Sequence, residues 1–124
     1  MGATVIRSPH PDVEIPDLPL HELVLARAAE RGNRTAVVDH PTGRTLTYGQ
    51  LAAGARQMAA GLAARGFGRG DVFAVYSPNL PEYVVAFYGV SAAGGATTTV
   101  NPLDTAGELA AVWLRTLTPA QLAE

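Results

Sequence analysis

The chain contains no cysteine and no lysine, and each absence removes a class of chemistry. Without cysteine, disulfides and thiolate metal sites are excluded. Without lysine, a nucleotide-binding loop that holds phosphates with a lysine cannot be built, because all nine basic residues are arginines. No apolar run approaches the roughly 18 residues needed to cross a bilayer. Residues 1–11 also lack the apolar core of a signal peptide. We therefore expect a cytoplasmic protein with no membrane span.

The composition is that of an ordinary globular protein. The 124 residues are 48% hydrophobic and 16% charged, enough for one small domain with a core of its own. The formal net charge is -2. A nucleic acid partner is not expected, because such partners are recognised by a basic surface.

The first half of the chain predicts a helix, a hairpin and a second helix. Residues 1–19 carry four prolines and are expected to be extended. Residues 20–31 predict a helix whose buried face holds Val24, Leu25, Ala28 and Ala29. Two short strands at 35–39 and 44–47 follow, joined by turn residues, so they predict a β-hairpin.

A capping box then predicts the start of the most regular helix. Thr47 stands at the cap position and Gln50 three residues later. Apolar residues recur beyond it at spacings of three and four, which makes one buried stripe. The stripe consists of Leu51, Ala55, Met58 and Leu62. The glycines of residues 66–70 end this helix.

Residues 71–104 predict a strand, a helix and a second strand. The run 72–76 is short and apolar, as in a buried parallel strand. Asn79 is expected to cap the next helix with Glu82, and Pro81 suits its first turn. The helix should be buried on most sides and end at residues 94–95, before a strand at 96–100.

The remainder predicts one more helix and a divergent tail. Thr105 and Glu108 form a capping pattern, with Leu109, Val112 and Trp113 on the expected buried side. Residues 118–121 repeat the capping pattern. The fold class is therefore α/β, with a short hairpin and a parallel β-α-β unit on which helices pack. We divide the chain into segments 1–19, 20–109 and 110–124.

Motifs that could carry chemistry have plainer explanations. The glycines of residues 66–70 follow a helix and precede a strand, which is the reverse of a phosphate-binding loop. Thr97, Thr98 and Thr99 suit a pleated strand. Ser77 lacks the glycines of a nucleophile elbow, so it is interpreted as a turn residue.

The remaining ionisable residues do not predict a site. His10, His21 and His40 are scattered, and Leu25 stands where a zinc helix would need its second histidine. The carboxylates at the ends of elements suit helix starts rather than acid–base work. These are Asp71, Glu82, Asp104 and Glu108.

Four segments in fixed order resemble the amino-terminal portion of acyl-adenylate-forming acyl-CoA ligases, in the 4-coumarate–CoA ligase-like branch. The second segment, residues 45–51, matches the family's first core motif, Leu-Thr-Tyr-x-x-Leu. The third segment, residues 70–72 with 79–83, is similar to the family's Asn-Ser-Pro-Glu-Phe. Together they cover roughly residues 15–109. The segments are residues 18–25, residues 45–51, residues 70–72 with 79–83, and residues 92–96 with 101–102.

The resemblance implies an activity but no site in this chain. Such enzymes activate a carboxylic acid with ATP and Mg²⁺ to an acyl adenylate, then transfer the acyl group to coenzyme A. The acid could be a hydroxycinnamate or a fatty acid. The family's phosphate loop and catalytic lysine have no counterpart here. We therefore predict no catalytic, cofactor-binding or metal-binding residue. We also predict that this chain alone binds none of ATP, Mg²⁺ and coenzyme A.

The departure from the family after about Leu109 suggests a truncated ligase that is inactive alone. Two other interpretations stay open. The chain could be a non-catalytic subdomain that binds the remainder of a split ligase, or a non-functional remnant. The expected partners are that remainder or a second copy of the chain.

Overall fold

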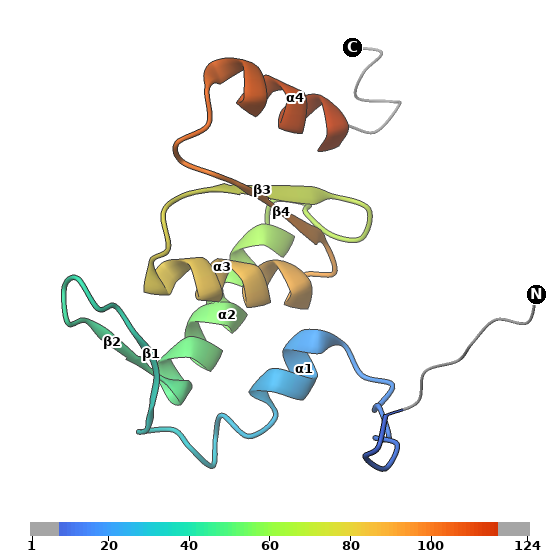
Figure 1. The fold of residues 1–124 in the computed structure, drawn as a ribbon, viewed down its shortest axis with the longest axis vertical. Helices are drawn as coiled ribbons and strands as arrows, with labels where there is room; N and C mark the ends of the chain where they lie inside the picture. Colours follow the sequence, from blue (N-terminus) through green and yellow to red (C-terminus); the bar gives the residue numbers. More distant parts are fainter. Residues whose placement is uncertain (1–7, 117–124) are drawn as a thin grey trace, which may run out of the picture.

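The computed structural model describes residues 8–116 as an α/β fold with two small sheets (Figure 1). The order of elements agrees with the sequence prediction: helix, hairpin, helix, strand, helix, strand, helix. The elements are α1 (Leu20–Leu25), β1 (Thr35–Val38), β2 (Thr45–Thr47), α2 (Tyr48–Ala63), β3 (Val72–Tyr76), α3 (Pro81–Ala92), β4 (Ala96–Val100) and α4 (Ala106–Thr116).

The two sheets are of opposite kinds, as predicted. β1 and β2 pair antiparallel, with a register shift between Thr35 and Val37. β3 and β4 pair parallel and in register, from Val72 opposite Ala96 to Tyr76 opposite Val100. A parallel pair needs a crossover connection, and α3 supplies it.

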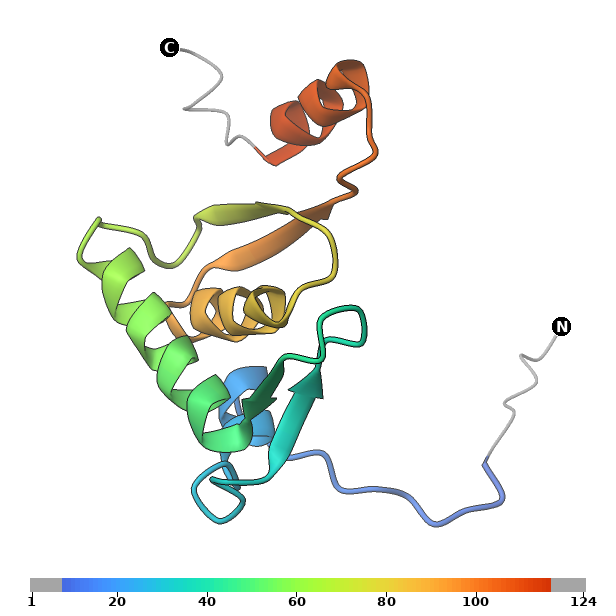
Figure 2. The ribbon, with the colours of Figure 1, turned by 90° about the vertical axis from the view of Figure 1, so that its left-hand side faces the viewer.

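The core lies where α2 and α3 pack against each other, and α3 also packs against one face of the parallel sheet (Figure 2). Gly89 of α3 packs tightly on α2, since a Cβ at this position would lie 2.5 Å from Met58 Cβ. α4 lies on the other side of the sheet (Figures 1 and 2). The buried apolar residues are Ala28, Leu51, Ala52, Ala55, Val75, Val90 and Val100.

The helix predicted for residues 20–31 is shorter than expected. α1 ends at Leu25, and hydrogen-bonded turns replace the helix beyond it. The predicted face was wrong in part, because Ala28 is buried while Val24 and Ala29 are exposed. A six-residue helix without a side-chain cap is marginal on its own, so tertiary contacts decide where it stops.

The start of α2 confirms the predicted capping box. The Thr47 hydroxyl accepts from the Gln50 backbone N–H at 3.2 Å, and the Gln50 side chain accepts from the Thr47 N–H at 2.9 Å. Along the predicted stripe, Leu51 and Ala55 are buried, and Met58 and Leu62 are half-buried. A local signal therefore sufficed to place this helix.

The cap predicted for α3 was wrong. Leu80, not Asn79, occupies the cap position, and no side chain caps the helix. Pro81 does stand in the first turn, and Gly94 ends the helix with a φ of 85°. The Glu82 carboxylate points instead to Arg44, because an arginine from the hairpin offers it a charged partner.

Burial of the parallel unit is less complete than predicted. Val72 is 38% exposed and Tyr76 51% exposed, so β3 buries only its inner face. Within α3, three residues are buried, and most of the others are half-buried. The outer face of β3 is therefore exposed, whereas apolar parallel strands suit burial on both faces.

The last described helix follows its predicted start. Thr105 and Glu108 exchange hydrogen bonds, and Leu109 and Val112 are half-buried. The side chain of Trp113 and the pattern at residues 118–121 lie outside the described part. No helix within the described residues is long and apolar enough to cross a membrane.

Candidate functional site

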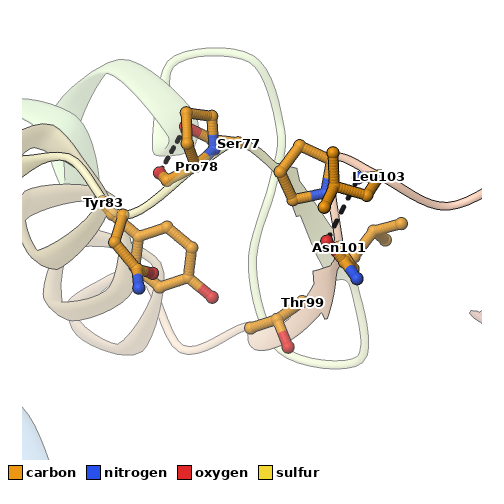
Figure 3. A pocket seen from close by; sticks show the side chains of 9 residues that line it. Ser77, Pro78, Tyr83, Thr99, Asn101 and Leu103 are labelled. Atoms are coloured by element: carbon orange, nitrogen blue, oxygen red, sulfur yellow. Dashed lines mark hydrogen bonds between the residues drawn. The ribbon is translucent and has the colours of Figure 1, made fainter.

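A cavity of about 450 Å³ lies at the carboxyl ends of β3 and β4 (Figure 3). In parallel α/β sheets this edge is where ligands most often bind. Tyr83 reaches it from α3, while Thr99 and Asn101 come from β4 and the loop after it (Figure 3). The lining residues are Ser77, Pro78, Asn79, Tyr83, Thr99, Val100, Asn101, Pro102 and Leu103.

The lining of this cavity mixes polar and apolar groups and carries no charge. It offers hydroxyl and amide groups, with no carboxylate and no arginine. Mg²⁺ prefers carboxylate and phosphate oxygens, and phosphates are usually held by cationic side chains or helix N–H groups. The cavity therefore does not fit ATP phosphates or a metal ion by its own residues.

Internal hydrogen bonds hold the two loops that form the cavity. The Ser77 hydroxyl donates to the Pro78 carbonyl at 2.9 Å, and the Leu103 N–H donates to Asn101 Oδ1 at 3.1 Å (Figure 3). The Tyr76 hydroxyl donates to the Pro102 carbonyl at 3.1 Å and so links the ends of the two strands. Ser77 thus lies in the loop between β3 and α3.

A second polar cluster joins the hairpin to the start of α3. The Arg44 guanidinium donates to Glu82 Oε2 at 2.8 Å, and its Nε lies 3.8 Å from Asp39 Oδ2. Asp39 is buried and also accepts from the Thr42 hydroxyl. The hydrogen bond with Arg44 lowers the pKa of Glu82, and the same bond raises the pKa of Arg44.

This ion pair predicts a pH-dependent effect of Glu82→Gln. Because the folded-state pKa of Glu82 lies below its unfolded value, the stabilisation is fully present above the usual glutamate pKa of about 4.3. It is lost as the pH falls through the lowered pKa. Urea unfolding should therefore find the variant less stable than the natural chain at pH 7, with the gap closing in strong acid.

Salt provides the control for this prediction. Both partners are exposed, so added salt should narrow the gap at pH 7. A gap that persists unchanged at pH 2 and at high salt would show that Glu82→Gln acts through something other than the ion pair.

The other residues considered from the sequence occupy structural positions. Gly66 and Gly70 have φ values of 81° and 98°, so this stretch is a turn that needs glycine. Asp71 Oδ2 accepts from the Gly68 N–H at 2.8 Å and holds the same turn. Residues 97–99 lie within β4. Hydrogen bonds from the Thr105 backbone and side chain lower the pKa of Glu108, as expected of a capping residue.

The histidines do not come together. His21 Nδ1 lies 3.1 Å from Ser91 Oγ and links α1 to α3, while His10 and His40 are exposed elsewhere. Within residues 8–116, no group of three metal-ligating side chains exists.

Sequence reasoning missed both polar features. Arg44 and Glu82 are 38 positions apart, and no local pattern links them. The cavity could have been anticipated, because the residues after two neighbouring parallel strands meet at one edge of the sheet.

Comparison with known proteins identifies the family. The model of the AMP-binding enzyme family matches residues 24–116. The chain is 45% identical over 107 residues to 4-coumarate–CoA ligase 5 of Oryza sativa subsp. japonica, covering 86% of this chain and 20% of that protein. It is 40% identical over 105 residues to 4-coumarate–CoA ligase of Pinus taeda, covering 84% and 20%. The chain thus spans about a fifth of the length of these relatives.

Solved structures that resemble this chain indicate the same family as the sequence comparison. A Mycobacterium tuberculosis fatty acyl CoA synthetase superposes with a TM-score of 0.70 at 29% identity, covering 77% of this chain and 19% of that one. The nonribosomal peptide synthetase FmoA3, bound to α-methyl-L-serine-AMP, gives a TM-score of 0.77 at 31% identity, covering 84% and 12%. The chain belongs to the AMP-binding enzyme family and resembles the amino-terminal part of its 4-coumarate–CoA ligase-like acyl-CoA synthetases.

Proposed function

We propose that the chain forms the opening part of the adenylation domain of an acid–CoA ligase. That enzyme would activate a carboxylic acid with ATP and Mg²⁺ to an acyl adenylate and then form the thioester with coenzyme A. The 45% identity to a 4-coumarate–CoA ligase carries the proposal. Among the acids, the names of the relatives favour a hydroxycinnamate over a fatty acid.

The role of these residues is to support the site rather than to react. Adenylation and acyl transfer need positioned charges that stabilise the transition state. The cavity at the strand ends carries no charge, and the chain has no lysine. ATP, Mg²⁺ and coenzyme A would therefore be held by the rest of such a ligase.

Acid-dependent exchange between ATP and pyrophosphate tests this role. The purified chain alone is expected to show only background exchange with a hydroxycinnamate or a fatty acid. A fusion of this chain to the downstream four-fifths of the rice relative should exchange with the hydroxycinnamate. Robust exchange by the chain alone would overturn the scaffold role, and an inactive but folded fusion would count against the proposed family activity.

The outer face of the sheet favours a second candidate, a subdomain that binds the remainder of a split ligase. Val72, Ala74 and Tyr76 are exposed there and carry no charge. Apolar patches of this kind mark surfaces that another part covers. Co-purification with the downstream part of a relative, supplied as a separate polypeptide, should then succeed. A chain that melts without cooperativity would instead favour a non-functional remnant.

A further inference from the structure

The parallel sheet keeps two free edges in the described part of the chain. Between residues 8 and 116 it consists of β3 and β4, so each strand has a partner on one side only. A free edge presents unpaired N–H and C=O groups that can pair with a further strand. Because this chain spans about a fifth of the length of its relatives, a complete ligase would supply further strands. The topology of the two described strands indicates which edge the next strand joins.

The helices that follow β3 and β4 lie on opposite faces of the sheet (Figures 1 and 2). α3 connects β3 to β4 and packs on one face, whereas α4 follows β4 and lies on the other. A connection between parallel strands of one sheet is right-handed in about 98% of cases. Two right-handed connections on opposite faces lead in opposite directions across the sheet. A parallel strand that follows α4 therefore lies beyond β3 rather than beyond β4.

The side chains of the two strands favour the same order. β3 has the sequence Val-Phe-Ala-Val-Tyr and is apolar throughout, which is typical of a central strand that is covered on both faces. β4 has the sequence Ala-Thr-Thr-Thr-Val, so its middle is polar and suits a position nearer the margin of a sheet. The composition thus also favours β3 as the neighbour of a further strand.

We infer that the free edge of β3 binds the next strand of the ligase, in parallel, so that β3 lies between this strand and β4. The identity of this partner rests on the proposed function, because the strand belongs to the downstream part of the enzyme. The connection through α4 passes over the outer face of β3 on its way to that edge. It would therefore cover the side chains of Val72, Ala74 and Tyr76, which are exposed in this chain.

Backbone N–H groups distinguish the two free edges. The Ala96 N–H donates to the Asp71 carbonyl at 2.9 Å, where β4 and β3 begin to pair. Because backbone groups alternate in direction along a strand, the Ala74 N–H points to the free edge of β3. By the same alternation the Thr99 N–H points to the free edge of β4. Each N–H is thus protected from exchange only when a strand pairs at its own edge.

Residue-resolved hydrogen exchange of two proteins tests the inference. One is this chain alone, and the other is its fusion to the downstream four-fifths of the rice relative. The Ala74 N–H should exchange about a hundredfold more slowly in the fusion, whereas the Thr99 N–H should keep its rate. Slower exchange at Thr99 with no change at Ala74 would overturn the inference and indicate a strand beside β4. A fusion in which neither N–H gains protection would overturn it too.

Proline at the same two positions provides a second, matched test. Ala74→Pro and Thr99→Pro each remove an N–H that the β3–β4 pair does not use, so both variants of the chain alone should keep a cooperative melt. In the fusion, Ala74→Pro should lower the melting temperature, and Thr99→Pro should leave it near that of the unsubstituted fusion. The reverse order of the two melting temperatures would contradict pairing at β3.

Exchange protection and ligase activity are separate readouts. An active fusion with an unprotected Ala74 N–H would overturn the pairing at β3 and leave the proposed function standing. A fusion that protects this N–H but lacks exchange between ATP and pyrophosphate would support the pairing and count against the proposed activity.

Discussion

Replacing Gly89 by alanine is expected to destabilise the fold by about 1–3 kcal/mol, the usual cost of overpacking a core. A Cβ at Gly89 would lie 2.5 Å from Met58 Cβ and 3.1 Å from the Ala55 carbonyl oxygen. Neither neighbour is the free end of a flexible side chain, so α2 and α3 would have to move apart. Urea unfolding of the purified chain measures the loss.

Gly61→Ala is the matched control, because Gly61 also lies inside a helix. A Cβ there would meet only the end of the Arg65 side chain, at 3.6 Å. Alanine favours the helix over glycine by about 0.5–1 kcal/mol, so this variant should be more stable than the natural chain. If both variants were stabilised, α2 and α3 would not pack as closely at Gly89 as the structure shows.

Val90→Asp is expected to abolish folding at neutral pH. Val90 is 0% exposed and lies on the side of α3 that packs into the core. An unpaired carboxylate buried there costs several kcal/mol, which is a large part of the 5–15 kcal/mol that stabilises a typical domain. Circular dichroism should show loss of the cooperative melt.

Val38→Asp makes the same chemical change at a position that is 61% exposed in β1. It should keep a cooperative melt, since water continues to solvate the new charge. A folded Val90→Asp variant with a melt like that of Val38→Asp would show that Val90 is not in the core.

Local signals in the sequence were enough where a few neighbouring residues carry the whole interaction. The capping box at Thr47 and Gln50 closes within four residues, and the structure contains both of its hydrogen bonds. Gly94 ended α3 as predicted, because a left-handed residue after a helix strongly favours glycine. The order of helices and strands followed from such signals, and four motifs in sequence predicted the family.

Prediction from the sequence failed where residues distant in the chain compete with local partners for the same side chain. Asn79 and Glu82 form a reasonable local capping pattern, yet Glu82 pairs with Arg44 from the hairpin. The helix predicted for residues 20–31 ended at Leu25, where packing of the following turns buries Ala28. Neither outcome has a signal within the local stretch.

By itself, then, the sequence determined the order of the elements, the absence of lysine and cysteine chemistry, and the predicted membership of an adenylate-forming family. Only the tertiary structure decided which faces are covered, where Glu82 finds its partner, and that the strand ends form an uncharged cavity. The reason is physical. Caps and turns are set by hydrogen bonds within a few residues, whereas burial, ion pairs and cavities depend on segments that meet only after the chain has folded.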